Sequence, residues 1–580
     1  MVLIGVEALQ YDLIFKAATV VDGSGGPRYQ ADVAVSNGII ADIGRINDSA
    51  KRTIDAHGLI LSPGFIDGHT HMDAQVAWDP LGSCSCWHGV TSVYMGNCGF
   101  ALAPCAPAER EWFARCLEAV EDIPTDAMMS GIDWTWETFP EYLNTVERLP
   151  KGINYGAYIA HSALRMYVMG ERALTETASD DDLRRMGDVV EAALLAGAIG
   201  FSTSRASTHV TPDGTPVASR VADWRELDYL VGRMAKLNRG VFQLGPDVSN
   251  GDSHRQFLAD VKDIAVRHGR PVMFGTLSTR QGQDPMPFSE QLASIDDSVR
   301  AGGRVYGQAT TRSINALFSF ESYLPFDALP VWRELRELPL AEQRERLQSR
   351  DMVARLVAEE ANMRPRDNVF QGGGAATTDP RKPDYRNLYA LQGVSWDDPS
   401  VAELSEQSGK HPVEVMVDLA LDNNMQQLFL QPLVNEVPDE VRTMLEHPRT
   451  LATFSDSGAH VCQEMGSSLQ THLLSYWVRD QQAFTLEQAV RMLTFDNALA
   501  WEMPDRGLLR RGYKADLVLF DEVTVKPQLP TVEHDLPGGS RRLVQKAQGI
   551  QMTVVNGAVS LENGEATGVN AGQLLRVHGA

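Results

Sequence analysis

The first segment that could carry chemistry places two histidines directly after an apolar run. In residues 61–71 (LSPGFIDGHTH), the apolar pair at 65–66 precedes His69 and His71. Side chains at positions i and i+2 of an extended chain point to the same side, so the two imidazoles are expected to face one site. Neutral imidazole is a common zinc ligand. The spacing predicts a metal site; the alternative is a pair of ordinary polar histidines at a strand end.

Two further segments end an apolar run in a potential ligand. Residues 89–100 (GVTSVYMGNCGF) contain Cys98, and residues 451–460 (LATFSDSGAH) contain Asp456. Near a metal, Cys98 would be a thiolate ligand; elsewhere it would be a small buried apolar side chain. Asp456 is able to bind a metal and accept a proton from water, or to cap a helix or turn. Three such strand ends together favour a metal-dependent catalytic site.

The elements that must position these residues differ between the ends and the middle of the chain. Short β-branched runs with turn signals, among them the hairpin dipeptide Asn37-Gly38, occupy the first sixty residues, and runs at 515–520 and 552–555 have the same character. We therefore expect residues 1–62 and 506–580 to build one small β domain together.

The middle of the chain alternates strand-like and helical stretches. This pattern implies parallel strands with right-handed crossovers, hence a doubly wound sheet or a (β/α)8 barrel. A less regular, proline-containing stretch around 281–450 is interpreted as a long insertion or lid. The expected strands are 155–160, 240–244 and 271–274, and the expected helices are 180–196, 224–238 and 487–500.

Bulk composition excludes several classes of protein. A net charge of −24 argues against nucleic-acid and anionic-membrane partners, which would be repelled. Six cysteines without zinc-finger spacing form no disulfide framework. We expect no secretory signal and no transmembrane helix, because no basic leader or long apolar run is present. A cytoplasmic setting is predicted.

Taken together, the motifs resemble a known family. The chain is similar to the amidohydrolase superfamily, specifically its N-acyl-D-amino-acid deacylase (D-aminoacylase) branch. The resemblance runs to about residue 560 and is weakest between 204 and 450. It is carried by PGFIDGHTH, HGVTSVYMGNCGF and SDSGAH, with support from IAHSALR, GAIGFST and KADLVLFD.

The resemblance implies a fold and a mechanism. The expected fold is a (β/α)8 TIM-like barrel over residues 63–505, with a small β-sandwich built from both termini. The implied reaction is amide hydrolysis by metal-activated water. His69, His71 and Asp456 would hold one metal position, Cys98 would be a ligand that serves or bridges a neighbouring position, and Asp456 would act as general acid and base.

The sequence departs from the family at two ligand positions. Family members carry further metal-binding histidines after the fifth and sixth strands, but residues 240–246 and 271–277 contain none. Gln243 is not assigned to metal, because amide oxygen is a poor zinc ligand. The simplest hypothesis is one tightly bound divalent ion per chain, zinc or another metal.

Five residues are candidates for substrate contact. His161 and Arg165 follow the strand 155–160, and the alternative for His161 is a structural hydrogen bond in the barrel mouth. Arg205 suits a substrate carboxylate or a neighbouring acid. His209 lies in the same loop as Arg205, and His460 follows Asp456 by four residues.

Three functional hypotheses follow. The leading one is hydrolysis of the amide of an N-acyl amino acid or similar N-acyl amine. The alternatives are hydrolysis of a cyclic amide, ureide or carbamate, and a catalytically silent homologue that acts as a binding or structural subunit. A small-molecule amide is the expected partner, and the resemblance implies a homo-oligomer.

Overall fold

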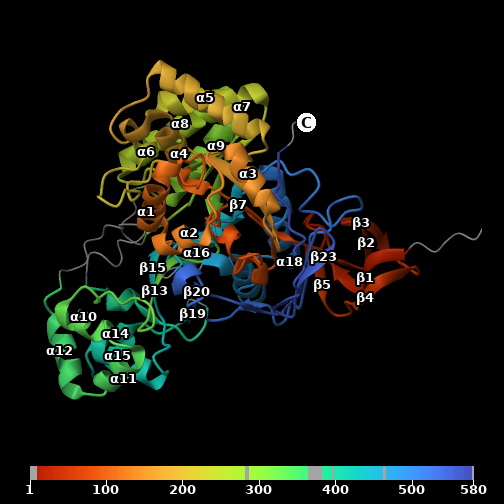
Figure 1. Ribbon diagram of the computed structural model, residues 1–580. Helices are drawn as coiled ribbons and strands as arrows, with labels where there is room; N and C mark the ends of the chain where they lie inside the picture. The colour runs from red at the N-terminus through yellow and green to blue at the C-terminus, as the bar shows by residue number, and fades with distance from the viewer. Residues whose placement is uncertain (1–9, 281–285, 364–381, 395–396, 462–465, 578–580) are drawn as a thin grey trace, which may run out of the picture.

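The structure is a computed structural model of the 580-residue chain. It describes residues 10–280, 286–363, 382–394, 397–461 and 466–577. Figure 1 shows a central barrel, a mainly helical segment at the lower left, and a β-rich region at the right where strands from the N-terminal and C-terminal parts of the chain lie side by side. Within the described ranges, no helix combines the length and apolarity needed to span a bilayer.

Eight parallel strands form the barrel, in the order β16-β12-β11-β10-β9-β8-β7-β6. Nearly every residue in them is buried, because helices cover the outside and side chains fill the inside. The strands are β6 Phe65–Asp67, β7 Val90–Met95, β8 Asn154–Ala160, β9 Gly200–Ser204, β10 Val241–Gly245, β11 Pro271–Phe274, β12 Arg304–Ala309 and β16 Thr450–Ala452. This confirms the predicted (β/α)8 barrel and the three predicted strands.

The first and last barrel strands meet at their carboxyl ends. The Thr453 hydroxyl donates to Asp67 Oδ1 at 2.8 Å, and the Gly68 N–H donates to Thr453 Oγ1 at 2.7 Å. These bonds bring together the segments that carry His69 and Asp456.

Helices cover the barrel between successive strands (Figure 1). The predicted helices at 180–196 and 224–238 are α5 and α7. The third, 487–500, is interrupted at Thr494, which leaves helical geometry with φ −128° and ψ −82°. The covering helices are α1 Arg110–Glu121, α2 Thr125–Gly131, α3 Phe139–Arg148, α4 His161–Met169, α5 Asp180–Leu195, α6 Ala218–Val221, α7 Trp224–Leu237, α8 Gly251–His268, α9 Phe288–Arg300, α17 Leu469–His472, α18 Leu486–Leu493 and α19 Phe495–Ala500.

A separate segment lies between β12 and β16. Its three-stranded sheet, in the order β13-β15-β14, packs with helices around its own core, where the Phe326 and Trp332 rings lie 4.4 Å apart. The elements are β13 Ile314–Phe318, α10 Pro330–Arg336, α11 Leu340–Leu347, α12 Arg350–Glu360, β14 Tyr389–Ala390, α14 Val401–Ser408, α15 Pro412–Asp422 and β15 Phe429–Val434. The helix that follows, α16 Pro438–Glu446, packs on β12 and β16 and belongs to the barrel core. The predicted insertion at 281–450 thus spans α9 and β12 of the barrel as well as this segment.

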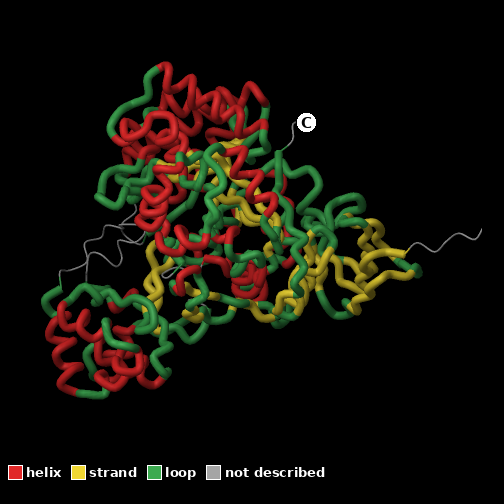
Figure 2. Tube along the Cα trace, viewed as in Figure 1, coloured by secondary structure: helices red, strands yellow, loops and turns green. Residues whose placement is uncertain are grey.

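Both ends of the chain contribute to one nine-stranded sheet, visible at the right of Figure 2. Its centre pairs β17 from the C-terminal part with β5 from the N-terminal part, in a register that aligns Leu519 with Leu61. The Asn37-Gly38 dipeptide turns β2 into β3 with positive φ at both residues (51° and 77°), as a tight hairpin requires. The strands are β1 Gln10–Val20, β2 Tyr29–Ser36, β3 Ile39–Gly44, β4 Ser49–Asp55, β5 Ile60–Pro63, β17 Leu517–Phe520, β22 Ile550–Val555, β23 Ala558–Glu562 and β24 Glu565–Ala566.

Candidate metal centre

Two imidazoles and a thiol converge at the carboxyl end of the barrel. Nitrogen atoms of His69 and His71 and the sulfur of Cys98 all lie within 4.8 Å of one another, and all three residues are buried. Between the histidines, Thr70 points away, and both its N–H and its hydroxyl bond to the Tyr94 carbonyl of β7. The alternation predicted from the sequence therefore directs both imidazoles to one side.

The segment after β7 holds Cys98 against the histidines. Asn97 donates its side-chain amide to the carbonyls of Thr70 and Tyr94, at 3.0 and 2.9 Å. Cys98 has a positive φ of 54°, which L residues adopt at a cost of roughly 1–2 kcal/mol. Its sulfur lies 3.4 Å from His69 Nε2. Such strain is typical of a residue that the surrounding structure holds for its function.

Asp456 completes the cluster from the loop after β16. Its Oδ1 lies 3.3 Å from His69 Nε2 and 3.4 Å from His71 Nε2, and this buried oxygen has no hydrogen-bond partner. The loop has positive φ at Phe454 (93°), Asp456 (51°) and His460 (48°). The Phe454 ring lies against the His69 ring, with centroids 3.8 Å apart.

These four side chains form a donor set that fits a divalent transition metal. Imidazole nitrogen, thiolate sulfur and carboxylate oxygen are the ligands zinc takes in proteins. The unpartnered Asp456 Oδ1, facing two Nε2 atoms, is an acceptor that only a cation or a donor between the side chains would satisfy. His69, His71, Cys98 and Asp456 are the four metal candidates predicted from the sequence.

Comparison with known proteins places the chain in a family. The model of the amidohydrolase family matches residues 52–560, most of the sequence. The chain belongs to the amidohydrolase family. The family assignment and the class of amide-hydrolysing enzyme predicted from the sequence are therefore confirmed.

Relatives of this amidohydrolase match along their whole length. D-aminoacylase from Alcaligenes xylosoxydans xylosoxydans is 26% identical, covering 98% of each chain. The N-acyl-D-aspartate deacylase of the same organism is 28% identical, covering 98% of this chain and 95% of the relative. The solved N-acyl-D-glutamate deacylase of Bordetella bronchiseptica, a complex with zinc and a phosphonate inhibitor, is 22% identical, with a TM-score of 0.65 and coverage of 98% and 100%. This structural similarity supports the fold.

The ends of the fifth and sixth strands lack the histidines that the resemblance implies. Gln243 in β10 uses its Oε1 to accept the Cys98 N–H at 2.9 Å, while its Nε2 is buried without a partner. After β11 come Gly275 and Thr276, and the Thr276 hydroxyl donates to the Leu277 carbonyl at 3.0 Å. Among the described residues, His69, His71 and Cys98 form the one cluster of three or more potential ligands whose donor atoms lie close enough to hold a metal ion.

In the amidohydrolase, an oxygen atom lies near the Nδ1 atom of each of the two clustered imidazoles. His69 Nδ1 lies 3.1 Å from Gln308 Oε1 in β12. His71 Nδ1 lies 3.6 Å from Glu121 Oε1, at the end of α1. Such partners orient metal-binding imidazoles and raise their basicity. Glu121 was not predicted from the sequence, although its four-residue spacing from buried Leu117 places a carboxylate on the apolar face of α1.

Burial and mutual charge perturb the ionisation of the cluster. Burial lowers the pKa of His69 to about 4, against an opposing effect of Asp456. Burial also opposes the charged form of His71, but Glu121 and Asp456 outweigh it and raise the His71 pKa well above its usual value. For Asp456, burial is outweighed by the close approach of His71 and the charges of His69 and His71, so its pKa falls to about 2. Burial raises the pKa of Cys98 to about 11, and a bound cation would favour its thiolate.

Two of the predicted substrate-contact residues lie beside the cluster. His460 Nε2 is 3.7 Å from Glu121 Oε2. The His209 ring packs on Phe100 with centroids 5.3 Å apart, and its Nδ1 is buried without a partner. Burial, followed by the charges of His71 and His460, lowers the pKa of His209 to about 3. Both histidines therefore lie close enough to the cluster to feel its charges.

The other three candidates make contacts inside the protein. His161 places Nδ1 2.8 Å from Thr203 Oγ1 and Nε2 2.7 Å from Glu226 Oε1. Arg165, fully buried, pairs with the second oxygen of Glu226 and donates to the Glu176 carbonyl at 2.7 Å. Arg205 donates to the Ser219 and Ala222 carbonyls at 3.1 and 2.6 Å.

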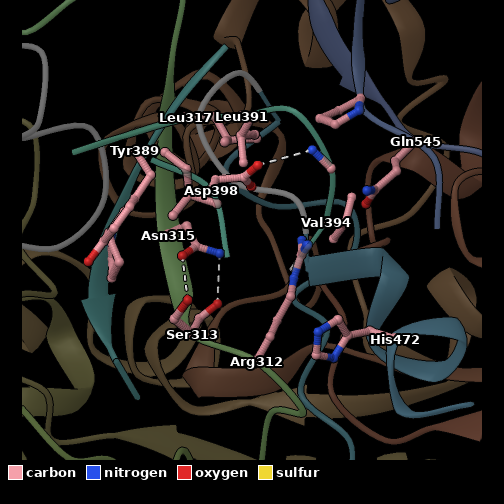
Figure 3. Close-up of a pocket in the computed structure, with 14 residues that line it drawn as sticks. Arg312, Ser313, Asn315, Leu317, Tyr389, Leu391, Val394, Asp398, His472 and Gln545 are labelled. Carbon is pink, nitrogen blue, oxygen red and sulfur yellow. Dashed lines mark hydrogen bonds between the residues drawn. The ribbon is translucent and has the colours of Figure 1, made fainter. Parts of the chain in front are cut away.

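A pocket of about 620 Å³, its open mouth included, lies between the inserted segment and α17 (Figure 3). Its walls come from β13, β14 and β15 of the inserted segment and from His472 of α17, and Arg312 extends across it. Arg312, Ser313 and Asn315 also line a smaller hollow that reaches Phe454, which packs on His69. The two hollows therefore share a wall, and the smaller one reaches the ring that packs on His69.

Proposed function

We propose that this amidohydrolase hydrolyses the amide bond of an N-acyl amino acid or a similar N-acyl amine, with one zinc ion held by His69, His71, Cys98 and Asp456. The observation that carries the proposal is the approach of Asp456 Oδ1 to both Nε2 atoms, at 3.3 and 3.4 Å. The activities of the relatives, which remove acyl groups from D-amino acids, support it.

The chain's own residues supply the proton transfers. A bound divalent cation would lower the pKa of water and polarise the amide carbonyl. Asp456 accepts a proton from the attacking water and returns it to the departing nitrogen, since its free oxygen faces the same point as the imidazoles. Gln308 and Glu121 keep the two imidazoles oriented toward that point.

A single tightly held ion fits the ligands available. Gln243, at the fifth strand end, already uses its oxygen on the Cys98 N–H, and no imidazole follows the described strand β11. Gln243 therefore acts through this hydrogen bond to orient Cys98. A homo-oligomer and a cytoplasmic location remain predictions from the sequence.

The pocket between the inserted segment and α17 is the proposed site for the amino acid part of the substrate, because the smaller hollow connects its Arg312 wall with Phe454, which packs on His69. Arg312 lines both hollows and offers a planar cation for the substrate carboxylate. Arg312→Gln should raise KM for N-acyl amino acids and leave KM for N-acyl amines without a carboxylate unchanged. An equal rise for both classes would contradict the role of Arg312.

The test is a substrate panel with the zinc-loaded enzyme. The panel contains N-acyl-D- and N-acyl-L-amino acids, neutral N-acyl amines, and cyclic amides, ureides and carbamates. The proposal predicts that open-chain N-acyl substrates are hydrolysed fastest. Preferential ring opening of cyclic substrates would support the alternative reaction instead. No turnover of any amide by metal-loaded protein would support the silent homologue.

A further inference from the structure

The last residue of α1 brings a second buried carboxylate to the metal centre. Glu121 is 3% exposed; its Oε1 lies 3.6 Å from His71 Nδ1 and its Oε2 lies 3.7 Å from His460 Nε2. We propose that Glu121 is a positioning residue that fixes the His71 imidazole for metal binding and ties it to His460. The inference rests on the proposed metal site and concerns a residue outside the ligand set.

Both the helix dipole and burial make a carboxylate energetically unfavourable at this position. Glu121 ends α1, where the helix dipole disfavours negative charge, and it lies on the face that buries Phe113, Leu117 and Val120. Burial of an unpaired carboxylate is strongly unfavourable. Burial accordingly raises the pKa of Glu121, whereas the neighbouring His71 and His460 charges lower it. The ion-pair partners of this buried carboxylate are the imidazoles of His71 and His460.

The geometry at His71 fits an orienting role. The ring presents Nε2 to Asp456 and the opposite Nδ1 to Glu121, 3.6 Å away, and Nδ1 has no hydrogen-bond partner. When Nε2 binds a metal, the proton of the neutral ring lies on Nδ1, which then donates toward the carboxylate. His69 has a neutral amide behind it, from Gln308, so Glu121 is the charged support of the pair.

A main-chain contact joins the same two segments. The His460 N–H donates to the Glu121 carbonyl, so the loop that carries Asp456 is tied to the end of α1 independently of the Glu121 side chain. Glu121→Gln therefore removes the charge and keeps the volume and this backbone bond. The substitution isolates the effect of the carboxylate on the imidazoles.

The experiment measures metal affinity by chelator competition, together with the cobalt(II) absorption spectrum and the kinetics of the loaded enzyme. Glu121→Gln should weaken metal binding about 10- to 100-fold, as loss of such orienting partners typically does. It should also shift the cobalt bands and lower kcat more than it raises KM. Glu121→Asp should partly restore the affinity.

The matched control is Glu118→Gln, the same substitution at an exposed position of α1. It should leave metal affinity and spectrum unchanged. Unchanged metal affinity and kcat in folded Glu121→Gln would overturn the positioning role. Because affinity and spectrum need no substrate, this result is distinct from failure of the proposed amide hydrolysis, which would appear in the wild-type substrate panel.

Discussion

Thr453 donates a hydrogen bond from its hydroxyl to the buried Asp67 carboxylate at 2.8 Å, and so joins the end of the last barrel strand to the end of the first. Asp67 also accepts the His69 N–H at 3.2 Å and a weaker bond from Gln470 at 3.3 Å. The loop that carries Asp456 and the segment that carries His69 are thereby held as one unit, on which the metal centre depends.

Removal of that bond should destabilise the protein and loosen the centre. Thr453→Val keeps the side-chain shape but leaves the buried Asp67 without its nearest donor, a loss of about 1–3 kcal/mol in unfolding free energy. Denaturant unfolding and chelator competition would measure both effects. Thr453→Ser, which retains the hydroxyl, is the control and should recover most of the loss. Equal stability of the valine variant and the wild type would contradict the linkage.

Substitution of Asp456 separates catalysis from folding. Asp456→Asn retains the side-chain size but removes the base, so kcat should fall by about 10²–10⁴-fold while the unfolding midpoint changes little. Steady-state kinetics and circular dichroism provide the measurements. Full activity in the asparagine variant would show that another group moves the proton.

Cys98→Ser distinguishes a sulfur ligand from a packed side chain. Serine is nearly isosteric but is a poor zinc ligand, so we expect a marked loss of bound metal and loss of the sulfur-to-cobalt absorption band in cobalt-substituted protein. Cys116→Ser, at a buried cysteine on α1 outside the cluster, is the comparison and should leave the band intact. A band unchanged by Cys98→Ser would assign Cys98 to packing.

His88, a buried histidine away from the metal centre, is expected to make the free energy of unfolding fall at acid pH. Burial lowers the pKa of His88 from 6.5 to about 3; its Nδ1 lies 2.7 Å from Thr471 Oγ1 and its Nε2 3.2 Å from the Gln545 carbonyl. Because the unfolded state binds the proton more readily, the stability contributed by neutral His88 is present above pH 6.5 and is lost as pH falls toward 3. The loss from pH 7.5 to pH 5 is about 2 kcal/mol.

His88→Gln should reduce that pH dependence. Denaturant unfolding at pH 7.5 and pH 5 would give the difference in unfolding free energy for both proteins. The glutamine variant, which has no titrating ring, should lose about 2 kcal/mol less than the wild type over this interval. Identical pH dependence of the two proteins would contradict a neutral, buried His88.

The sequence predicted those parts of the site that depend on local geometry. His69 and His71 share a side because they alternate after β6, and Cys98 and Asp456 follow their own strands closely. Glu121 was missed because its approach to His71 depends on where the end of α1 packs, which no local pattern specifies.

The role of a residue likewise depends on partners that are distant in the sequence. His161 and Arg165 look like barrel-mouth residues in sequence, but their partner Glu226 comes from α7, more than sixty residues later. The break at Thr494, in contrast, has a local contribution: its hydroxyl bonds back to the Val490 carbonyl at 2.6 Å, an alternative to continued helix.

The number of metal ions per chain tests the central claim most directly. Purified protein, loaded with zinc and dialysed against metal-free buffer, would be analysed by inductively coupled plasma mass spectrometry beside His69→Ala and Asp456→Asn variants. A single-ion centre on His69, His71, Cys98 and Asp456 predicts one zinc per wild-type chain and a much lower content in His69→Ala. Two tightly held ions per wild-type chain, or an unchanged content in His69→Ala, would contradict it.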